Sequence, residues 1–342
     1  MMDLIRELKK RLAALRGQVA SGRELHPDLS AALAAAFPGR PVRDVTSLSG
    51  GLSGATLIAF VVDGAPYVAK RSGALDPGDP ERAAREVACQ RIASERGVAP
   101  RLRHADARTG VTIMDRVAGA PLRPSEDPTL LDKVATALRR LHDGPPFPRG
   151  PSRLDFLRSV DAQCAALAGA GLPADLVRTA EELERVSAPH AHAAPCHRDL
   201  NPNNVLVAAD RVVFVDWTAA GAGDPFVDLA QLGVFALPRP EQREALLHAY
   251  LGRSATDEER ARAHVARALA LALYAASFFL AGARVSGSRG SPPADEEPRP
   301  LAEVIAAFGA APERTHPATV AAALLCEMRR EARPLGAARD QP

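Results

Sequence analysis

Two short apolar runs, Val205–Val207 and Val212–Val215, lie in the middle of the chain and are separated by four residues that include an aspartate. This alternation of apolar run and polar turn predicts an antiparallel β-hairpin. In the register that the loop length favours, Asn204 lies opposite Val215, one residue before Asp216. Paired strand residues are roughly 5 Å apart, so the side chains of Asn204 and Asp216 could share one cation.

A second hairpin is predicted closer to the N-terminus. The apolar run Leu57–Val62 is followed by the turn dipeptide Asp63–Gly64 and the run Ala65–Arg71. Side chains alternate along a strand, so Val68 and Lys70 share one face, where they could offer an apolar wall to adenine and an ammonium group to phosphate. Lys70 is one of four lysines among 43 basic residues, which favours a site that requires a compact ammonium group over an edge-strand lysine reaching into solvent.

A helix is predicted after this hairpin. Asp79 is suited to cap its start, and Gly97 is suited to end it after Arg96. Glu86 lies on the face that carries small residues and can approach a sheet, so we predict that Glu86 pairs with Lys70. Two other glutamates of the helix are competing partners.

Three further segments have a clear pattern. Residues 1–16 have leucine and isoleucine at helical spacing, which predicts an amphipathic helix that packs on the same chain, with dimer formation or membrane contact as alternatives. The uncharged stretch Ala268–Ala283 is shorter than the roughly 20 residues of a membrane span, so we expect a buried helix and no span. Residues 286–300 predict an exposed loop, whose acidic part, 291–300, is either solvated or guards a cationic substrate.

The composition narrows the class of protein. A length of 342 residues with 46% hydrophobic residues suffices for two lobes and a large core. A net charge of +2 with dispersed basic residues argues against a nucleic-acid surface. The four cysteines are far apart and the charged first residues do not fit a signal peptide, so we expect reduced thiols in a cytoplasmic protein.

The strongest chemical signal is the run HRDLNPNNVL (His197–Leu206), followed by FVDW (Phe214–Trp217). Asp199 can accept a proton from an attacking hydroxyl, while the amide oxygen of Asn204 and the carboxylate of Asp216 can hold Mg²⁺ on a nucleoside triphosphate. Each part of the pattern also occurs in ordinary turns. The full order is much rarer and predicts phosphoryl transfer.

A glycine-rich stretch, LSGGLSGAT, covers Leu48–Thr56 between two apolar runs. Its three glycines permit close approach of backbone N–H groups to a ligand, and its hydroxyl groups could add contacts to phosphate. It is neither a P-loop nor a dinucleotide fingerprint, and by itself it would be a turn. The candidate phosphate-binding residues are Ser49, Gly50, Gly51, Ser53 and Gly54.

The order of these motifs resembles the aminoglycoside phosphotransferase and choline kinase superfamily, which shares the protein-kinase-like fold. The resemblance runs from about Val45 to Ala236 and includes SGGLSG, VAK, the helix glutamate, HRDLNPNNVL, VDW and GDPFVDLA. It implies an α+β fold with a helical extension (1–40), an N-lobe with a small antiparallel sheet (41–117) and a mostly helical C-lobe that holds the substrate site (118–342). ATP would bind between the two lobes.

Position by position, the resemblance implies roles for five residues. Asp199 would be the catalytic base, and Asn204 and Asp216 would bind Mg²⁺. Lys70, held by Glu86, would contact the α- and β-phosphates of ATP.

The resemblance also assigns the surroundings of the nucleotide. The segment Thr112–Val117 would include the linker between the lobes, with its backbone facing adenine at Met114, Asp115 and Val117, and the glycine-rich stretch would cover the phosphates. Asp228 would brace the catalytic loop and cap the next helix. Thr218 stands where the family often has an acid, which removes one possible contact to a cationic substrate.

We therefore predict Mg²⁺-dependent transfer of the γ-phosphate of ATP to a hydroxyl of a small molecule. The acceptor is an amino alcohol such as choline, ethanolamine or thiamine, held by aromatic faces, or an aminoglycoside or macrolide antibiotic. The aromatic candidates are Trp217, Phe226, Phe235, Tyr250, Tyr274, Phe278 and Phe279.

Two other classes of function are alternatives. A protein kinase fits less well, because Trp217–Thr218 replaces Phe-Gly after Asp216 and the chain there is too short for an activation loop. A nucleotide-binding regulator without turnover is the other, and the complete set of candidate catalytic residues argues against it. The preference for ATP over GTP and the oligomeric state stay open, and a dimer through residues 1–16 is not predicted.

Overall fold

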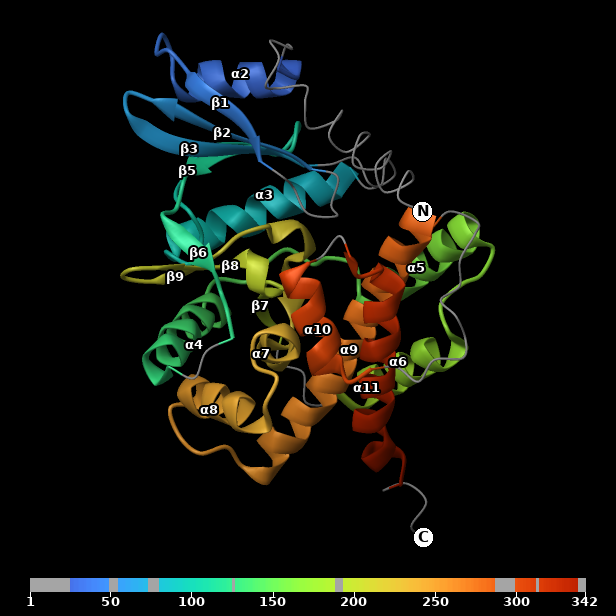
Figure 1. Cartoon of the computed structure of the whole chain (residues 1–342). Helices are drawn as coiled ribbons and strands as arrows, with labels where there is room; N and C mark the ends of the chain where they lie inside the picture. The colour runs from blue at the N-terminus through green and yellow to red at the C-terminus, as the bar shows by residue number, and fades with distance from the viewer. Residues whose placement is uncertain are drawn as a thin grey trace.

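The computed structural model describes residues 25–48, 55–72, 80–124, 127–187, 193–286, 299–311 and 314–337. A small lobe built on a β-sheet sits on a larger, mostly helical lobe (Figure 1). This arrangement confirms the two-lobed α+β fold. The helix predicted in residues 1–16 and the phosphate loop at 49–54 lie outside the described residues, as does most of the predicted acidic loop.

The small lobe contains a five-stranded antiparallel sheet in the order β1-β2-β3-β5-β4. Its strands are β1 (Arg43–Leu48), β2 (Thr56–Val62), β3 (Ala65–Arg71), β4 (Leu102–Asp106) and β5 (Val111–Asp115). β2 and β3 form the predicted hairpin, in which Asp63 and Gly64 have φ angles of 49° and 78°, as a two-residue turn with both φ angles positive requires. β3 is a central strand, with Val68 opposite Met114 of β5.

Helix α2 (Pro27–Ala36) covers one face of this sheet (Figure 1). Its leucines are buried in an apolar layer to which β3 contributes Tyr67 and Ala69. Because side chains alternate along a strand, Val68 and Lys70 lie on the opposite face of the sheet. That face is the one available to a ligand and to the large lobe.

Helix α3 (Pro80–Glu95) lies between the sheet and the large lobe (Figure 1). It is followed by Gly97 with a φ of 71°, so the helix ends within one residue of the predicted position. The carbonyl oxygen of Val98 accepts the N–H of Phe214 at 2.7 Å. This hydrogen bond ties the end of α3 to the hairpin that carries the candidate catalytic residues.

Two small sheets shape the centre of the large lobe. They contain β6 (Gly119–Pro121), β8 (Val205–Ala208) and β9 (Val212–Phe214) in one sheet, and β7 (Ala194–Cys196) and β10 (Gly221–Gly223) in the other. β8 and β9 pair in the predicted register, with Val205 opposite Phe214. The N–H of Val215 donates to the carbonyl oxygen of Asn204 at 2.9 Å, so Asn204 lies next to the residue that precedes Asp216, as predicted.

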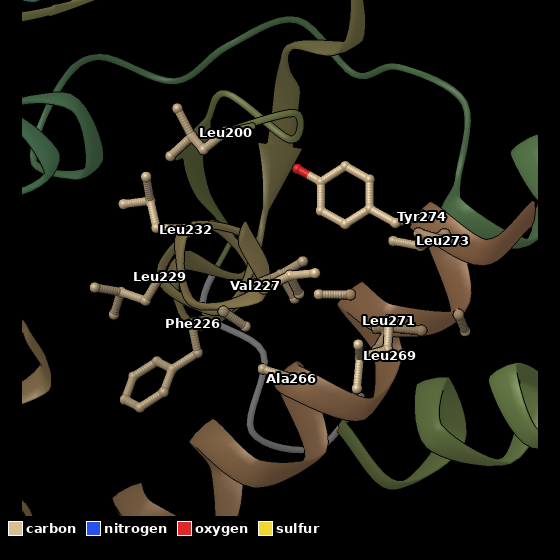
Figure 2. Packing of buried hydrophobic residues seen from close by; sticks show 14 of the residues in the cluster. Leu200, Phe226, Val227, Leu229, Leu232, Ala266, Leu269, Leu271, Leu273 and Tyr274 are labelled. Carbon is tan, nitrogen blue, oxygen red and sulfur yellow. The ribbon is translucent and has the colours of Figure 1, made fainter. Parts of the chain in front are cut away.

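Helices make up the remainder of the large lobe, with α9 at its centre (Figure 1). They are α4 (Pro128–His142), α5 (Arg153–Ala168), α6 (Ala174–Ser187), α7 (Pro225–Phe235), α8 (Pro240–Leu251), α9 (Asp257–Ser286), α10 (Leu301–Ala310) and α11 (Pro317–Ala337). Figure 2 shows α7 and α9 packing through apolar side chains.

Helix α9 is the one helix of the described residues that is long and apolar enough to span a membrane. However, 83% of its most apolar 18-residue window is buried inside the protein. The stretch Ala268–Ala276 is almost wholly inaccessible to solvent, as expected for a core helix. Its aromatic C-terminal part, discussed below, is less buried.

Candidate active site

The catalytic loop, His197–Asn204, is held from below by helix α7. Asp228 of α7 accepts the backbone N–H groups of His197 and Arg198 at 2.8 and 2.9 Å, so it braces the loop as predicted. It does not cap α7, because the side chain that accepts an N–H at the start of that helix belongs to Asp224. A cap must precede the helix, and Asp228 already lies in its first turn.

Asp228 is completely buried, and its charge is compensated locally. Burial by itself raises the pKa of Asp228, but the hydrogen bond from His142 at 3.2 Å, the nearby His197 and the backbone N–H groups bring the pKa below its usual range. His142, Cys196 and Asp228 bring three potential metal-ligand atoms within 4.8 Å of one another. The oxygens of Asp228 already accept two N–H groups and a histidine, so this cluster serves to hold the loop.

Asp199 is half-buried in the large lobe, with both carboxylate oxygens in hydrogen bonds. Asn201 Nδ2 donates to Oδ1 at 3.2 Å, and Asn204 Nδ2 donates to Oδ2 at 3.1 Å. Burial raises the pKa of Asp199, and the charge of Asp216 adds to the rise, against opposing effects of His197 and the two asparagines. A carboxylate with a raised pKa is a better proton acceptor than an ordinary aspartate.

Asn204 is oriented by its amide nitrogen. Nδ2 donates to the Asp199 carboxylate and also to the Asp199 carbonyl oxygen, at 2.9 Å. Because both hydrogen bonds use the nitrogen, the amide oxygen of Asn204 stays available as a ligand for a hard cation.

Lys70 joins the two lobes. Its Nζ donates to Glu86 Oε1 at 2.5 Å, to Asp216 Oδ1 at 2.7 Å and to Thr218 Oγ1 at 2.9 Å. Lys70 and Glu86 are 5% and 3% exposed, which confirms a buried pair in place of a solvent-exposed lysine. Burial lowers the pKa of Lys70, but Glu86 and Asp216 outweigh burial and raise it, so the ammonium group is charged.

Asp216 has a left-handed backbone, with a φ of 65°. Its Oδ1 accepts from Lys70 and from the hydroxyl of Thr218 at 2.7 Å. Burial raises the pKa of Asp216, but Lys70 and Thr218 lower it to about 2. Within the described residues its Oδ2 has no protein partner, so this oxygen and the amide oxygen of Asn204 are a donor set that fits Mg²⁺.

Thr218 has a role that sequence reasoning missed. Its hydroxyl accepts from Lys70 and donates to Asp216, so it orders both groups. From the sequence we treated Thr218 only as the loss of an acid. Its position two residues after Asp216 in a tight 3₁₀ turn, Trp217–Ala219, is what brings the hydroxyl back toward the carboxylate.

The residues predicted to face adenine have different surroundings. Asp115 does not use its side chain there, since both carboxylate oxygens bind Arg103 at 2.6 and 3.0 Å, and its N–H donates to Arg101. Met114 is 7% exposed and accepts a hydrogen bond from Gln90. In the part of the chain that is described, the N–H of Val117 has no hydrogen-bond acceptor, so it remains a candidate donor to the base.

Aromatic side chains line the large lobe beside Asp199. The hydroxyl of Tyr274 lies 3.5 Å from Asp199 Oδ1, and Figure 2 shows this hydroxyl pointing toward the loop of Leu200. Phe235 packs edge-on against Tyr274 with ring centres 4.8 Å apart, and Phe278 packs against both Phe235 and Phe308. Phe235, Phe278 and Phe308 are partly exposed and otherwise pack against the hydrophobic core.

Of the other aromatic candidates, Trp217 and Phe226 are buried, whereas Tyr250 and Phe279 are partly buried against the core. Trp217 is 1% exposed and packs against His197 and Phe147. Phe226 is buried under the guanidinium group of Arg262. Tyr250 contacts His142 through its hydroxyl at 2.9 Å, and Phe308, on α10, was not among the sequence candidates.

Comparison with known proteins agrees with this geometry. Residues 44–264 match the phosphotransferase enzyme family. Protein LicA of Haemophilus influenzae is 41% identical over 56 residues, which are 16% of this chain and 21% of that protein. The chain thus spans only about a fifth of the length of the curated relatives it matches.

Solved structures are similar over most of their length. A choline/ethanolamine kinase family protein from Mesorhizobium loti is 28% identical, with a TM-score of 0.59, over 87% of this chain and 98% of that one. Choline kinase LicA from Streptococcus pneumoniae is 16% identical, with a TM-score of 0.60, over 74% and 89%. A streptomycin–ATP–APH(2")-IIa complex is 18% identical, with a TM-score of 0.53, over 76% and 91%. The last two show a shared fold.

Proposed function

The chain belongs to the phosphotransferase enzyme family, and we propose that it is a small-molecule kinase that transfers the γ-phosphate of ATP to a hydroxyl group. One observation carries the proposal. An unbroken series of contacts runs from Asp199 through Asn204 to the hairpin, and from Asp216 through Lys70 to Glu86. A proton acceptor, two oxygen ligands and a buried ammonium group are the parts that phosphoryl transfer requires.

The nucleotide would lie between the lobes. Lys70 faces the large lobe already oriented by Glu86, so its ammonium group is suited to contact phosphate oxygens once Asp216 is engaged elsewhere. Mg²⁺, held by Asn204 and Asp216, would supply compensation for the negative charge of the phosphates. The N–H of Val117 and the side chains of Val68 and Met114 are the groups we assign to adenine.

Asp199 would orient the acceptor hydroxyl and take its proton. The hydrogen bonds from Asn201 and Asn204 fix the rotation of the carboxylate. Its raised pKa favours proton transfer from an alcohol. Most of the rate enhancement would come from this positioning and from electrostatics.

The acceptor we propose is an amino alcohol such as choline or ethanolamine. Tyr274 contacts the candidate base. From Tyr274, a series of ring contacts continues through the partly exposed side chains of Phe235, Phe278 and Phe308. Aromatic faces attract substituted ammonium groups by cation–π interaction, worth about 0.5–2 kcal/mol each. The similarity to a choline/ethanolamine kinase family protein supports the same acceptor class.

ADP release, measured with ATP and Mg²⁺ over a panel of amino alcohols, aminoglycosides, macrolides and peptides, tests this function. We expect release with at least one amino alcohol, with a phosphorylated product of matching mass, and release at least about 100-fold slower with the Asp199→Asn variant. Release with an antibiotic alone would assign a different acceptor class. Release with peptides alone, or nucleotide binding without release on any panel member, would contradict a small-molecule kinase.

A further inference from the structure

A buried glutamine on α7 forms hydrogen bonds with the backbone on both sides of the residue that we assign as the base. Gln231 Nε2 donates to the carbonyl oxygen of Arg198 at 2.7 Å, and Gln231 Oε1 accepts the N–H of Leu200 at 3.2 Å. These two backbone groups lie on either side of Asp199. Gln231 is 2% exposed, so neither hydrogen bond competes with bulk water.

The loop at this point has a conformation that needs support. Arg198 has a φ of 67°, in the left-handed region that residues other than glycine rarely adopt. Such a backbone persists where the surroundings hold it from several directions. Asp228, one helical turn before Gln231, holds the N–H groups of His197 and Arg198. Within the described residues, none of its hydrogen bonds reaches the loop after Asp199.

Among the described side chains of α7, Gln231 is the one that hydrogen-bonds to the loop after Asp199. Its amide is suited to this position because one end donates and the other accepts. An ionised glutamate would place an acceptor against the Arg198 carbonyl, and an apolar residue of similar size would leave two buried backbone groups without partners. The chemistry of the position therefore selects an amide.

We propose that Gln231 is a positioning residue for the phosphoryl-transfer reaction. By tying the peptide groups before and after Asp199 to α7, it fixes the direction in which the Asp199 carboxylate points. This inference rests on the proposed function, since the orientation of the Asp199 carboxylate affects turnover only if Asp199 is the base.

The test compares Gln231→Met with Gln242→Met. Gln242 is also buried, and its amide oxygen also accepts a backbone N–H, at the start of α8 and away from the site. We expect Gln231→Met to lower kcat about 10- to 100-fold, as small misplacements of a reacting group do, with the KM values of both substrates within about twofold. Gln242→Met should leave kcat within about twofold.

A second variant has a pH readout. A protonated glutamate can donate to Arg198 and accept from Leu200, so the ratio of Gln231→Glu to wild-type kcat should rise as the pH falls. A role in general stability alone predicts a ratio that changes with pH only as far as the folded fraction does, which circular dichroism at each pH measures. If Gln231→Met fails to fold, this ratio decides.

Amide hydrogen exchange separates this inference from the proposed function. In Gln231→Met, exchange at Leu200 should increase by at least tenfold whether or not the wild-type protein has a detectable acceptor. Normal exchange and a kcat within twofold of wild type would overturn the inference. Absence of wild-type turnover would instead remove the proposed function.

Discussion

The Nζ atom of Lys70 lies 2.7 Å from Asp216 Oδ1, although 146 positions separate the two residues in the chain. Lys70 comes from the central strand of the small lobe and Asp216 from the turn after β9 in the large lobe. The pair therefore joins the two lobes at the site we assign to the phosphates. Its charges also set the pKa of both groups, because each stabilises the ionised form of the other.

Replacing Lys70 should affect stability and activity separately. Lys70→Met leaves Glu86 buried without its cationic partner, which costs about 3–5 kcal/mol of unfolding free energy. It also removes a phosphate contact, which lowers kcat/KM about 10²- to 10³-fold. The double variant Lys70→Met/Glu86→Gln removes the buried charge. In the double variant, urea unfolding should show that stability is recovered, while the rate of ADP release stays low. Recovery of both stability and ADP release would contradict a phosphate contact.

Removal of the base should lower kcat without weakening nucleotide binding. Asp199→Asn keeps the size of the side chain but accepts no proton, so we expect kcat to fall about 10²- to 10⁴-fold. The Kd for ATP, measured by calorimetry, should change by less than about threefold. A variant with more than a tenth of the wild-type kcat would show that another group accepts the proton.

The raised pKa of Asp199 has a consequence for the pH profile. The base is active when deprotonated, so activity falls as the pH drops through its pKa, and this acidic limb should lie above the ordinary aspartate value of about 4. Initial rates from pH 4 to 8 test it, with circular dichroism to confirm that the protein stays folded. A limb at or below pH 4 would indicate that burial does not raise this pKa.

Asp216 should contribute to stability in a pH-dependent way. Its pKa of about 2 in the folded protein lies below the value of about 4 in an unfolded chain. The contribution is therefore fully present above pH 4 and is lost as the pH falls from 4 to 2. The difference in unfolding free energy between wild type and Asp216→Asn should shrink over that range, and a constant difference would contradict the assignment.

The rings of Phe235, Phe278 and Phe308 should affect the binding of the acceptor and not the binding of ATP. Phe278→Ala removes one partly exposed ring, so KM for the best cationic acceptor should rise about 2- to 30-fold, the range that one cation–π contact covers. KM for ATP should stay within about twofold. Phe156→Ala, an exposed ring on α5, is the control, and an equal loss of affinity for an uncharged acceptor of the same shape would argue for packing alone.

Local sequence was sufficient where neighbours in the chain make the structure. The β8–β9 hairpin places Val205 opposite Phe214 as predicted, because a short loop between two apolar runs leaves few registers. The Lys70–Glu86 pair was also predictable, since a strand and the next helix face each other across a short connection. The ion pair of Asp115 with Arg103 was missed. It depends on the pairing of β4 with β5, whose register shifts between Leu102 and His104.

The order of apolar runs, turns and charged residues by itself determined the catalytic hairpin and the identity of the chemical groups, and the resemblance of the motifs to a known family implied the two lobes. The tertiary structure alone decided their environment. Thr218, Tyr274 and Gln231 contact the site from a 3₁₀ turn, α9 and α7, and a side chain's depth and partners follow from how distant helices pack. Packing of this kind sums many weak contacts between residues far apart in the chain, and no local spacing records it.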